Sequence, residues 1–134
     1  MFLADDTGML NLLRAKAGNG VRIRMLIGDP DSAEVAERGT HEGIEDALAS
    51  KIRNVRVLLR PLSTVPGVEI RQHSTILYNS IYRADGQLLV NSHIYGQPAA
   101  QAPVTHLRQI AGGTLVATYL ESFERVWSES RPLD

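Results

Sequence analysis

The sequence contains no cysteine and few aromatic residues, and none of its apolar runs approaches the ~20 residues that span a bilayer. Without cysteine the chain forms neither a disulfide framework nor a thiolate metal site, which fits a cytoplasmic protein. The first residues, MFLADDTGML, have no basic segment and no long apolar segment, so no signal peptide is expected. We therefore predict a cytoplasmic protein without a membrane partner.

The chain also lacks an excess of charge of either sign. Its formal net charge is −1, and its arginines are scattered instead of lying in one block. Proteins that bind nucleic acid present a basic patch to the phosphates, so we expect no DNA binding by this segment alone. The length of 134 residues and a hydrophobic content of 43% are typical of one globular domain with a real core.

The spacing of apolar residues predicts helices that alternate with strands. A helix over residues 5–17 followed closely by a strand over residues 21–28 is typical of α/β proteins. The further elements expected are a helix capped by Asp31 or Ser32, a helix over 44–59, a loop bracketed by Pro61 and Pro66, a strand over 67–73, a hairpin, a loop over 97–103, and an amphipathic helix over 112–130 with Leu115, Tyr119, Phe123, Val126 and Trp127 on one stripe. The fold class is therefore α/β.

Most of the chemistry-bearing side chains lie between His73 and Gly96. Asp85 and Gly86 suit a two-residue hairpin loop, and this loop pairs Ala84 with Gln87 and, further out, other residues in steps of two. The pairing is expected to place His73, Thr75, Leu77, Asn79, Ile81, Val90, Ser92 and Ile94 on one face, and Tyr78, Ser80, Tyr82, Asn91, His93 and Tyr95 on the other. Neither face is simply apolar or simply charged, so we expect one of them to open into a pocket.

Three interpretations of this hairpin stay open. In the first, His73 or His93 is a nucleophile and the neighbouring hydroxyl and amide groups bind developing negative charge, although the stretch contains no lysine to serve as a cation. In the second, the polar groups line a small-molecule pocket. In the third, they form a satisfied network that stabilises the sheet.

A second candidate site lies at residues 28–43, which follow a predicted strand and open a helix. Ligands of open α/β sheets bind at such places. The acidic residues Asp29, Asp31 and Glu34 suit a hard cation, but helix capping is the favoured interpretation. Arg38 and Glu42, four residues apart, suit a surface ion pair, and His41 beside them suits a place near the pocket.

No metal site is expected from the histidines. His41, His73, His93 and His106 are scattered along the chain, without the HxH or HExxH spacing that brings ligands together on one strand or helix.

Three runs carry a family resemblance: GVRIRMLIGDPDSAEVAERGTHEGIEDALA, GVEIRQHSTILYNSIYRADGQLLVNSHIYG and HLRQIAGGTLVATYLESFERVWSES. Together they resemble the phospholipase D-like domain found behind a helix-turn-helix in bacterial XRE-type transcriptional regulators. The resemblance covers nearly the whole chain. It implies a mixed β-sheet flanked by helices on both faces, and a single-motif half that pairs with a second copy.

The resemblance also assigns roles to residues. Enzymes of this family carry an HxKxxxxD motif whose histidine attacks a phosphodiester and whose lysine binds phosphate. His73 matches the motif histidine, but Thr75 stands in place of the lysine and Ser80 in place of the aspartate. On the return strand Asn91 and Ser92 are the nearest match to a Gly-Ser pair. Losing the lysine removes the charge that neutralises phosphate, so the resemblance favours a pseudoenzyme over an enzyme.

The leading prediction is therefore a single, catalytically degenerate phospholipase D-like domain over residues 1–134, acting as the ligand-sensing or dimerisation module of a transcriptional regulator. The residues predicted to bind a small polar or phosphorylated ligand are His73, Thr75, Asn79, Asn91, Ser92 and His93, with Asp29, Arg38 and Glu42 as a secondary group. No cofactor is expected. Two alternatives remain: a divergent phosphodiesterase with His73 as nucleophile, and a purely structural interaction module.

The predicted partners follow from the same resemblance. A homodimer is expected, because single-motif members pair two copies about a two-fold axis. DNA contact is expected only through a helix-turn-helix that this sequence does not contain. The chain begins with a helix where an α/β domain usually begins with a strand, so a first strand is expected upstream, and its neighbour is expected to have an exposed edge.

Overall fold

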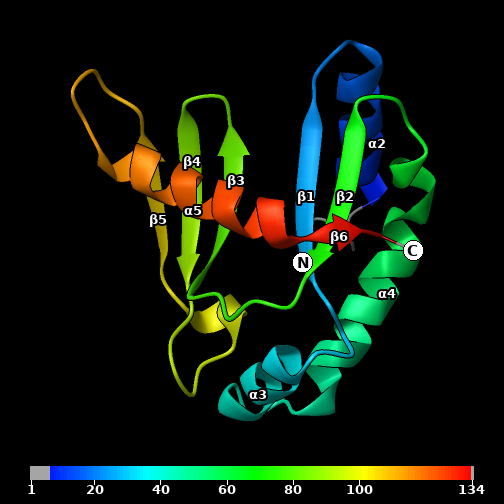
Figure 1. The fold of residues 1–134 in the computed structure, drawn as a ribbon, viewed down its shortest axis with the longest axis vertical. Coiled ribbons are helices and arrows are strands. Elements are labelled where there is room, and N and C mark those ends of the chain that lie inside the picture. The colour runs from blue at the N-terminus through cyan, green and yellow to red at the C-terminus, as the bar shows by residue number, and fades with distance from the viewer. Residues whose placement is uncertain (1–6, 134) are drawn as a thin grey trace.

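The computed structural model describes residues 7–133 and confirms an α/β fold (Figure 1). The described elements are α2 (Thr7–Gly18), β1 (Ile23–Gly28), α3 (Ala33–His41), α4 (Asp46–Ser63), β2 (Val68–His73), β3 (Asn79–Ala84), β4 (Gln87–Ser92), η1 (Ala99–Gln101), β5 (Val104–Arg108), α5 (Leu115–Glu129) and β6 (Arg131–Pro132). Residues 5 and 6 of the first predicted helix lie outside the described residues.

The described strands form two three-stranded sheets. In the first, β1 and β2 are parallel and β6 adds antiparallel to β2, giving the order β1-β2-β6. In the second, β3, β4 and β5 are antiparallel neighbours in chain order. Within the described residues β1 pairs with β2 alone, so its other edge is open.

The hairpin has the predicted register. Ala84 pairs with Gln87, Ile81 with Val90 and Asn79 with Ser92. Asp85 has a positive φ of 51° in the loop, a conformation that Asp tolerates because its short side chain bonds locally. Local turn chemistry therefore sufficed to predict this part of the structure.

The extension of the hairpin face to His73 and Thr75 is wrong. β2 ends at His73, which pairs with Gly28 of β1 in the first sheet, and the second sheet begins only at Asn79. Residues 74–78 form no strand, so the alternation of side chains is broken between the two sheets. His73 thus does not share a strand face with Asn79 and Ser92.

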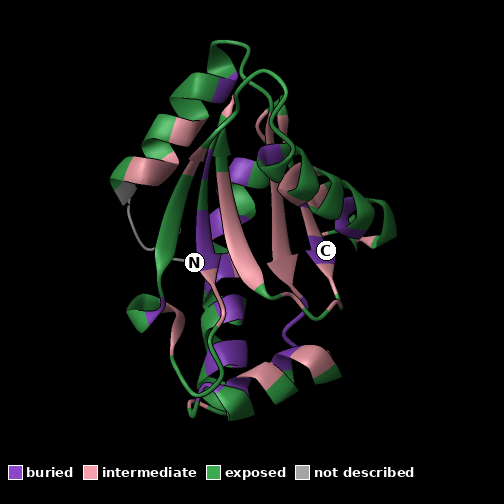
Figure 2. Cartoon of the chain, turned by 90° about the vertical axis from the view of Figure 1, so that its left-hand side faces the viewer, coloured by how far each residue is buried: buried purple, intermediate pink, exposed green. Residues whose placement is uncertain are grey.

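Three groups of buried side chains make the core (purple in Figure 2). In the first, α4 packs on β2 through Leu59, Leu62 and Ile70, with α2 beside them. In the second, Val35 of α3 packs against Leu48 and its neighbours on α4. In the third, α5 packs on β4. α3 is therefore held against the long helix α4, and this contact fixes where α3 meets the strands.

Two details of the helices differ from prediction. Pro61 lies inside α4, which continues to Ser63, because burial of Leu59 and Leu62 on either side stabilises this last turn. Leu115 is exposed, and the buried residue at the start of α5 is Val116, which contacts the cluster of Leu88 and Val90 on β4. The stripe of α5 thus begins one residue later than its sequence indicates.

Helix α5 crosses both sheets (Figure 1). Its first half packs on β4, and its second half reaches β1, where Glu124 accepts two hydrogen bonds from Arg24 at 3.1 and 2.6 Å. The guanidinium groups of Arg24 and Arg71 lie over the Trp127 ring, 5.1 and 4.4 Å from its centroid. No helix described over residues 7–133 is long and apolar enough to cross a membrane.

Candidate functional site

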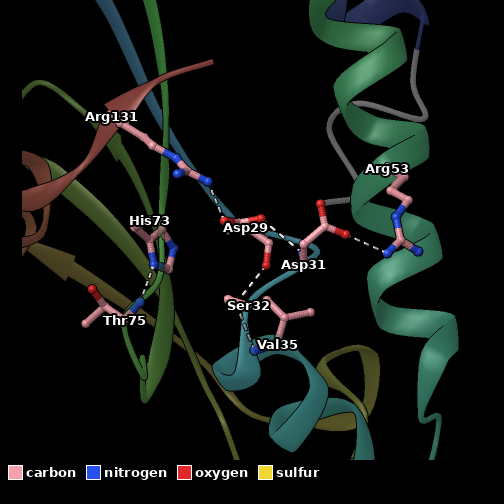
Figure 3. Close-up of polar contacts among 8 residues, drawn as sticks. All are labelled: Asp29, Asp31, Ser32, Val35, Arg53, His73, Thr75 and Arg131. Carbon is pink, nitrogen blue, oxygen red and sulfur yellow. Dashed lines mark hydrogen bonds and ion pairs between the residues drawn. The ribbon is translucent and has the colours of Figure 1, made fainter. Parts of the chain in front are cut away.

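Polar residues gather at the carboxyl ends of the parallel strands β1 and β2 (Figure 3). Asp29 follows β1 directly, and its N–H donates to the carbonyl of His73, the last residue of β2, at 2.8 Å. Ligands of α/β proteins bind at this end of a parallel sheet because the strands stop there and the following loops diverge. α3 begins at the same place.

The acidic residues of this loop have structural partners. The Asp29 carboxylate accepts from the N–H of Asp31 at 3.0 Å and pairs with Arg131 of β6 at 2.5 Å. Asp31 pairs with Arg53 of α4 at 2.9 Å, and Ser32 is the N-cap of α3, its hydroxyl accepting from the N–H of Val35. Among residues 7–133, no group of three or more His, Asp or Glu side chains is arranged to hold a metal ion.

His73 is half-buried, and its ring has one backbone partner. Nδ1 accepts a hydrogen bond from the N–H of Thr75 at 3.3 Å, so the neutral ring carries its proton on Nε2. The pKa of His73 lies below its ordinary value, first because burial disfavours the charged ring and second because the charge of Arg38 acts on it. His73 is therefore a neutral N–H donor near pH 7.

His93, which follows β4, is held by two contacts. Nδ1 donates to the carbonyl of Leu77 at 2.8 Å, and Nε2 lies 3.2 Å from the hydroxyl of Ser80. Because the carbonyl only accepts, Nδ1 carries the proton and Nε2 of the neutral ring accepts from Ser80. Burial lowers the pKa of His93, and the charge of Arg38 lowers it further.

Arg38 of α3 is the cation common to both histidines. Its charge lowers the pKa values of His73 and His93, and it opposes the rise that burial causes in the pKa of Tyr82. Within the part of the chain that the structure describes, its Nε is buried without a hydrogen bond of good geometry, although Glu42 Oε2 lies 3.3 Å away as an ion-pair partner. The cation that acts on both histidines is thus supplied by α3, and not by Arg83 of the hairpin itself.

The structure brings together only part of the predicted set. The charge of Arg38 acts on His73 of the first sheet and on His93 and Tyr82 of the second. Ser80 is the hydrogen-bond partner of His93, and Glu42 is the ion-pair partner of Arg38. Sequence reasoning placed Tyr82 on the hairpin face of Ser80 and His93 but did not include it among the ligand-binding residues, and it named Arg38 and Glu42 only as a secondary group. Local alternation grouped Ser80, Tyr82 and His93, but no local pattern could have brought them to Arg38 and Glu42, which lie on α3.

Other predicted residues have different surroundings. The buried amide of Asn91 donates to the carbonyls of Ala99, Ala102 and Pro103 at 3.2 to 3.4 Å, which holds the loop before β5. The N–H of Ser92 donates to the carbonyl of Pro103. Thr75 contributes its backbone N–H to His73. Asn91 therefore has a structural explanation that needs no ligand.

Comparisons with protein-family models, with curated proteins and with solved structures returned no match to this chain.

Proposed function

We propose that this chain is a ligand-sensing domain that binds a small anion between Arg38, His73 and His93. The observation that carries the proposal is the position of Arg38, whose charge acts on both histidines and whose Nε is buried without a hydrogen bond to any residue that the structure describes. Glu42 is the ion-pair partner of this guanidinium, with Oε2 3.3 Å from Nε, but the geometry is too poor for a hydrogen bond. A buried N–H without a well-aligned hydrogen bond costs free energy, and the oxygen of a bound anion can supply that bond.

The groups around Arg38 suit an anion. In the neutral tautomer the Nε2–H of His73 is a donor with no hydrogen bond to residues 7–133. A nearby anion favours the protonated form of a histidine, so a bound ligand raises the pKa of both rings. Sulfate, phosphate and phosphate esters are the simplest ligands of this chemistry.

The histidine contacts favour binding over the phosphodiesterase alternative. A nucleophilic histidine needs a free lone pair on the attacking nitrogen and a group that holds the proton on the other nitrogen. In His73 the arrangement is reversed, because Nδ1 accepts from Thr75 and the proton is on Nε2. No carboxylate pairs with this ring among the ion pairs of the described residues.

The regulatory setting comes from the resemblance to the phospholipase D-like domain of bacterial XRE-type regulators. In that setting the domain senses its ligand and pairs with a second copy, and a helix-turn-helix elsewhere in the regulator contacts DNA. The degenerate motif supports this assignment, because Thr75 and Ser80 replace the lysine and aspartate of the enzymes.

The test measures thermal unfolding with sodium sulfate against sodium chloride at equal ionic strength. Ligand at ten times its Kd adds about 1.4 kcal/mol to stability, which raises Tm by about 4 °C for a domain of this size. Arg38→Ala is expected to abolish the sulfate-specific rise. Arg53→Ala, which removes an exposed arginine paired with Asp31, is the matched control and keeps it. Equal shifts in sulfate and chloride, or an unchanged shift in Arg38→Ala, would overturn the proposal.

A further inference from the structure

The two segments that flank the site expose large apolar side chains. Ile76 and Tyr78, between His73 and β3, are 56% and 77% exposed, and Ile94 and Tyr95, directly after His93, are 40% and 81% exposed. The N–H of His93 donates to the carbonyl of Tyr78 at 2.8 Å, so the two segments lie side by side at this histidine. We name these four side chains, Ile76, Tyr78, Ile94 and Tyr95, the apolar rim.

The rim is attached to the helix that carries Arg38. The N–H of Gly96 donates to the carbonyl of His41 at 3.0 Å, and the rings of His41 and Tyr95 have centroids 5.0 Å apart with a tilt of 55°. His41 follows Arg38 by three residues, so the two side chains lie on the same side of α3. The Tyr95 ring therefore lies against His41, on the side of α3 that also carries Arg38.

Grouped apolar side chains at the border of a polar site are typical of a surface that binds the apolar part of a ligand. Two of the four are tyrosines, whose flat faces stack on other rings with little loss of conformational freedom. Planar bases stack on such side chains in many nucleotide complexes. A flexible alkyl chain gains less here, because a rim so open to water covers only one side of it.

We propose that the ligand is a phosphate ester with a planar aromatic group, of which a nucleoside monophosphate is the simplest example. This inference rests on the anion site proposed above. The phosphate lies against Arg38 and the two histidines, and the aromatic group stacks on the tyrosines of the rim.

The experiment compares four probes by isothermal titration calorimetry: inorganic phosphate, AMP, adenosine and n-hexyl phosphate. AMP is expected to bind at least tenfold more tightly than inorganic phosphate or hexyl phosphate, and adenosine more weakly than AMP. Tyr95→Ala is expected to lower the affinity for AMP toward that for phosphate and to leave phosphate binding unchanged. Val57→Ala, which shortens an exposed apolar side chain on α4, is the control and changes neither.

The outcomes separate this inference from the anion site. If AMP, hexyl phosphate and inorganic phosphate bind with equal affinity, and Arg38→Ala weakens all three, the aromatic ligand is wrong and the anion site stands. If hexyl phosphate binds as tightly as AMP, and both bind more tightly than inorganic phosphate, the rim binds alkyl chains and the aromatic ligand is again wrong. If no phosphate probe binds, or adenosine binds as well as AMP, the anion site itself is wrong.

Discussion

Glu42 Oε2 lies 3.3 Å from Arg38 Nε, and the carboxylate side chain is only 7% exposed. Glu42 is the C-cap residue of α3, so both partners lie on one turn at the end of this helix. The cation of the proposed site is thus already paired, and an anionic ligand competes with a carboxylate of the protein. The affinity of the site for an anion therefore depends on how strongly Glu42 holds Arg38.

We expect Glu42→Gln to strengthen sulfate binding. The substitution keeps the shape of the side chain and removes one negative charge beside the anion. Two unit charges about 4 Å apart in water interact by about 1 kcal/mol, which corresponds to roughly fivefold in Kd. Without sulfate the variant is expected to unfold at a lower temperature, because Arg38 loses its partner. Calorimetric titration of both proteins measures the first effect. Glu37→Gln, on the exposed side of α3, is the control; weaker sulfate binding by Glu42→Gln would contradict the model.

Stability is expected to depend on pH through His73 and His93. Burial and Arg38 hold both pKa values below the ordinary value of about 6.5, so the unfolded chain binds more protons than the folded chain in mildly acidic solution. The contribution of both neutral rings to the free energy of unfolding is complete above pH ~6.5, and it is lost as the pH falls through the pKa values of the folded state. Urea unfolding at pH 7.5 and at pH 5.5 measures this loss.

The same pH experiment with saturating sulfate is expected to show a smaller loss, because the bound anion raises both pKa values. Ring-proton NMR titration of the two histidines provides the direct check. Values at or above 6.5 in the protein without sulfate would refute the predicted dependence.

Gly39→Ala is expected to destabilise the protein by about 1–3 kcal/mol, the usual cost of forcing an extra group into a packed site. A Cβ at this position lies 2.2 Å from the carbonyl oxygen of Glu45, so the segment between α3 and α4 must shift. The shift moves Arg38 and is expected to weaken sulfate binding as well. Urea unfolding measures the cost. At Gly18, where no atom lies within 4 Å, alanine is expected to be neutral or stabilising.

Asn91→Ala is expected to cost about 1–3 kcal/mol of stability, because three carbonyls of the loop before β5 lose their donor in a buried place. Sulfate affinity is expected to stay unchanged in the folded variant. Asn54→Ala, at an exposed position of α4, is the control, with an effect within about 0.5 kcal/mol. Loss of sulfate binding with unchanged stability would instead make Asn91 a ligand-binding residue.

Local sequence signals predicted those parts of the fold that depend on neighbours in the chain. The Asp85-Gly86 loop sets the pairing of β3 with β4, because the turn and the strands are continuous. β5 was missed, because its side chains are mostly exposed and no alternation of apolar residues marks it. The face of His73 was assigned wrongly, since no residue type announces that the chain leaves one sheet and enters another over residues 74–78.

The sequence by itself determined the α/β class, the hairpin register and the choice of chemistry-bearing residues, because periodicity and turn preferences act over a few residues. Only the tertiary structure decided which of them meet. Packing of α3 on α4 places Arg38 within electrostatic reach of His73 and His93, which belong to different sheets. The cation that acts on both histidines thus comes from a helix more than thirty residues upstream of His73, and only the packing of the core brings these residues together.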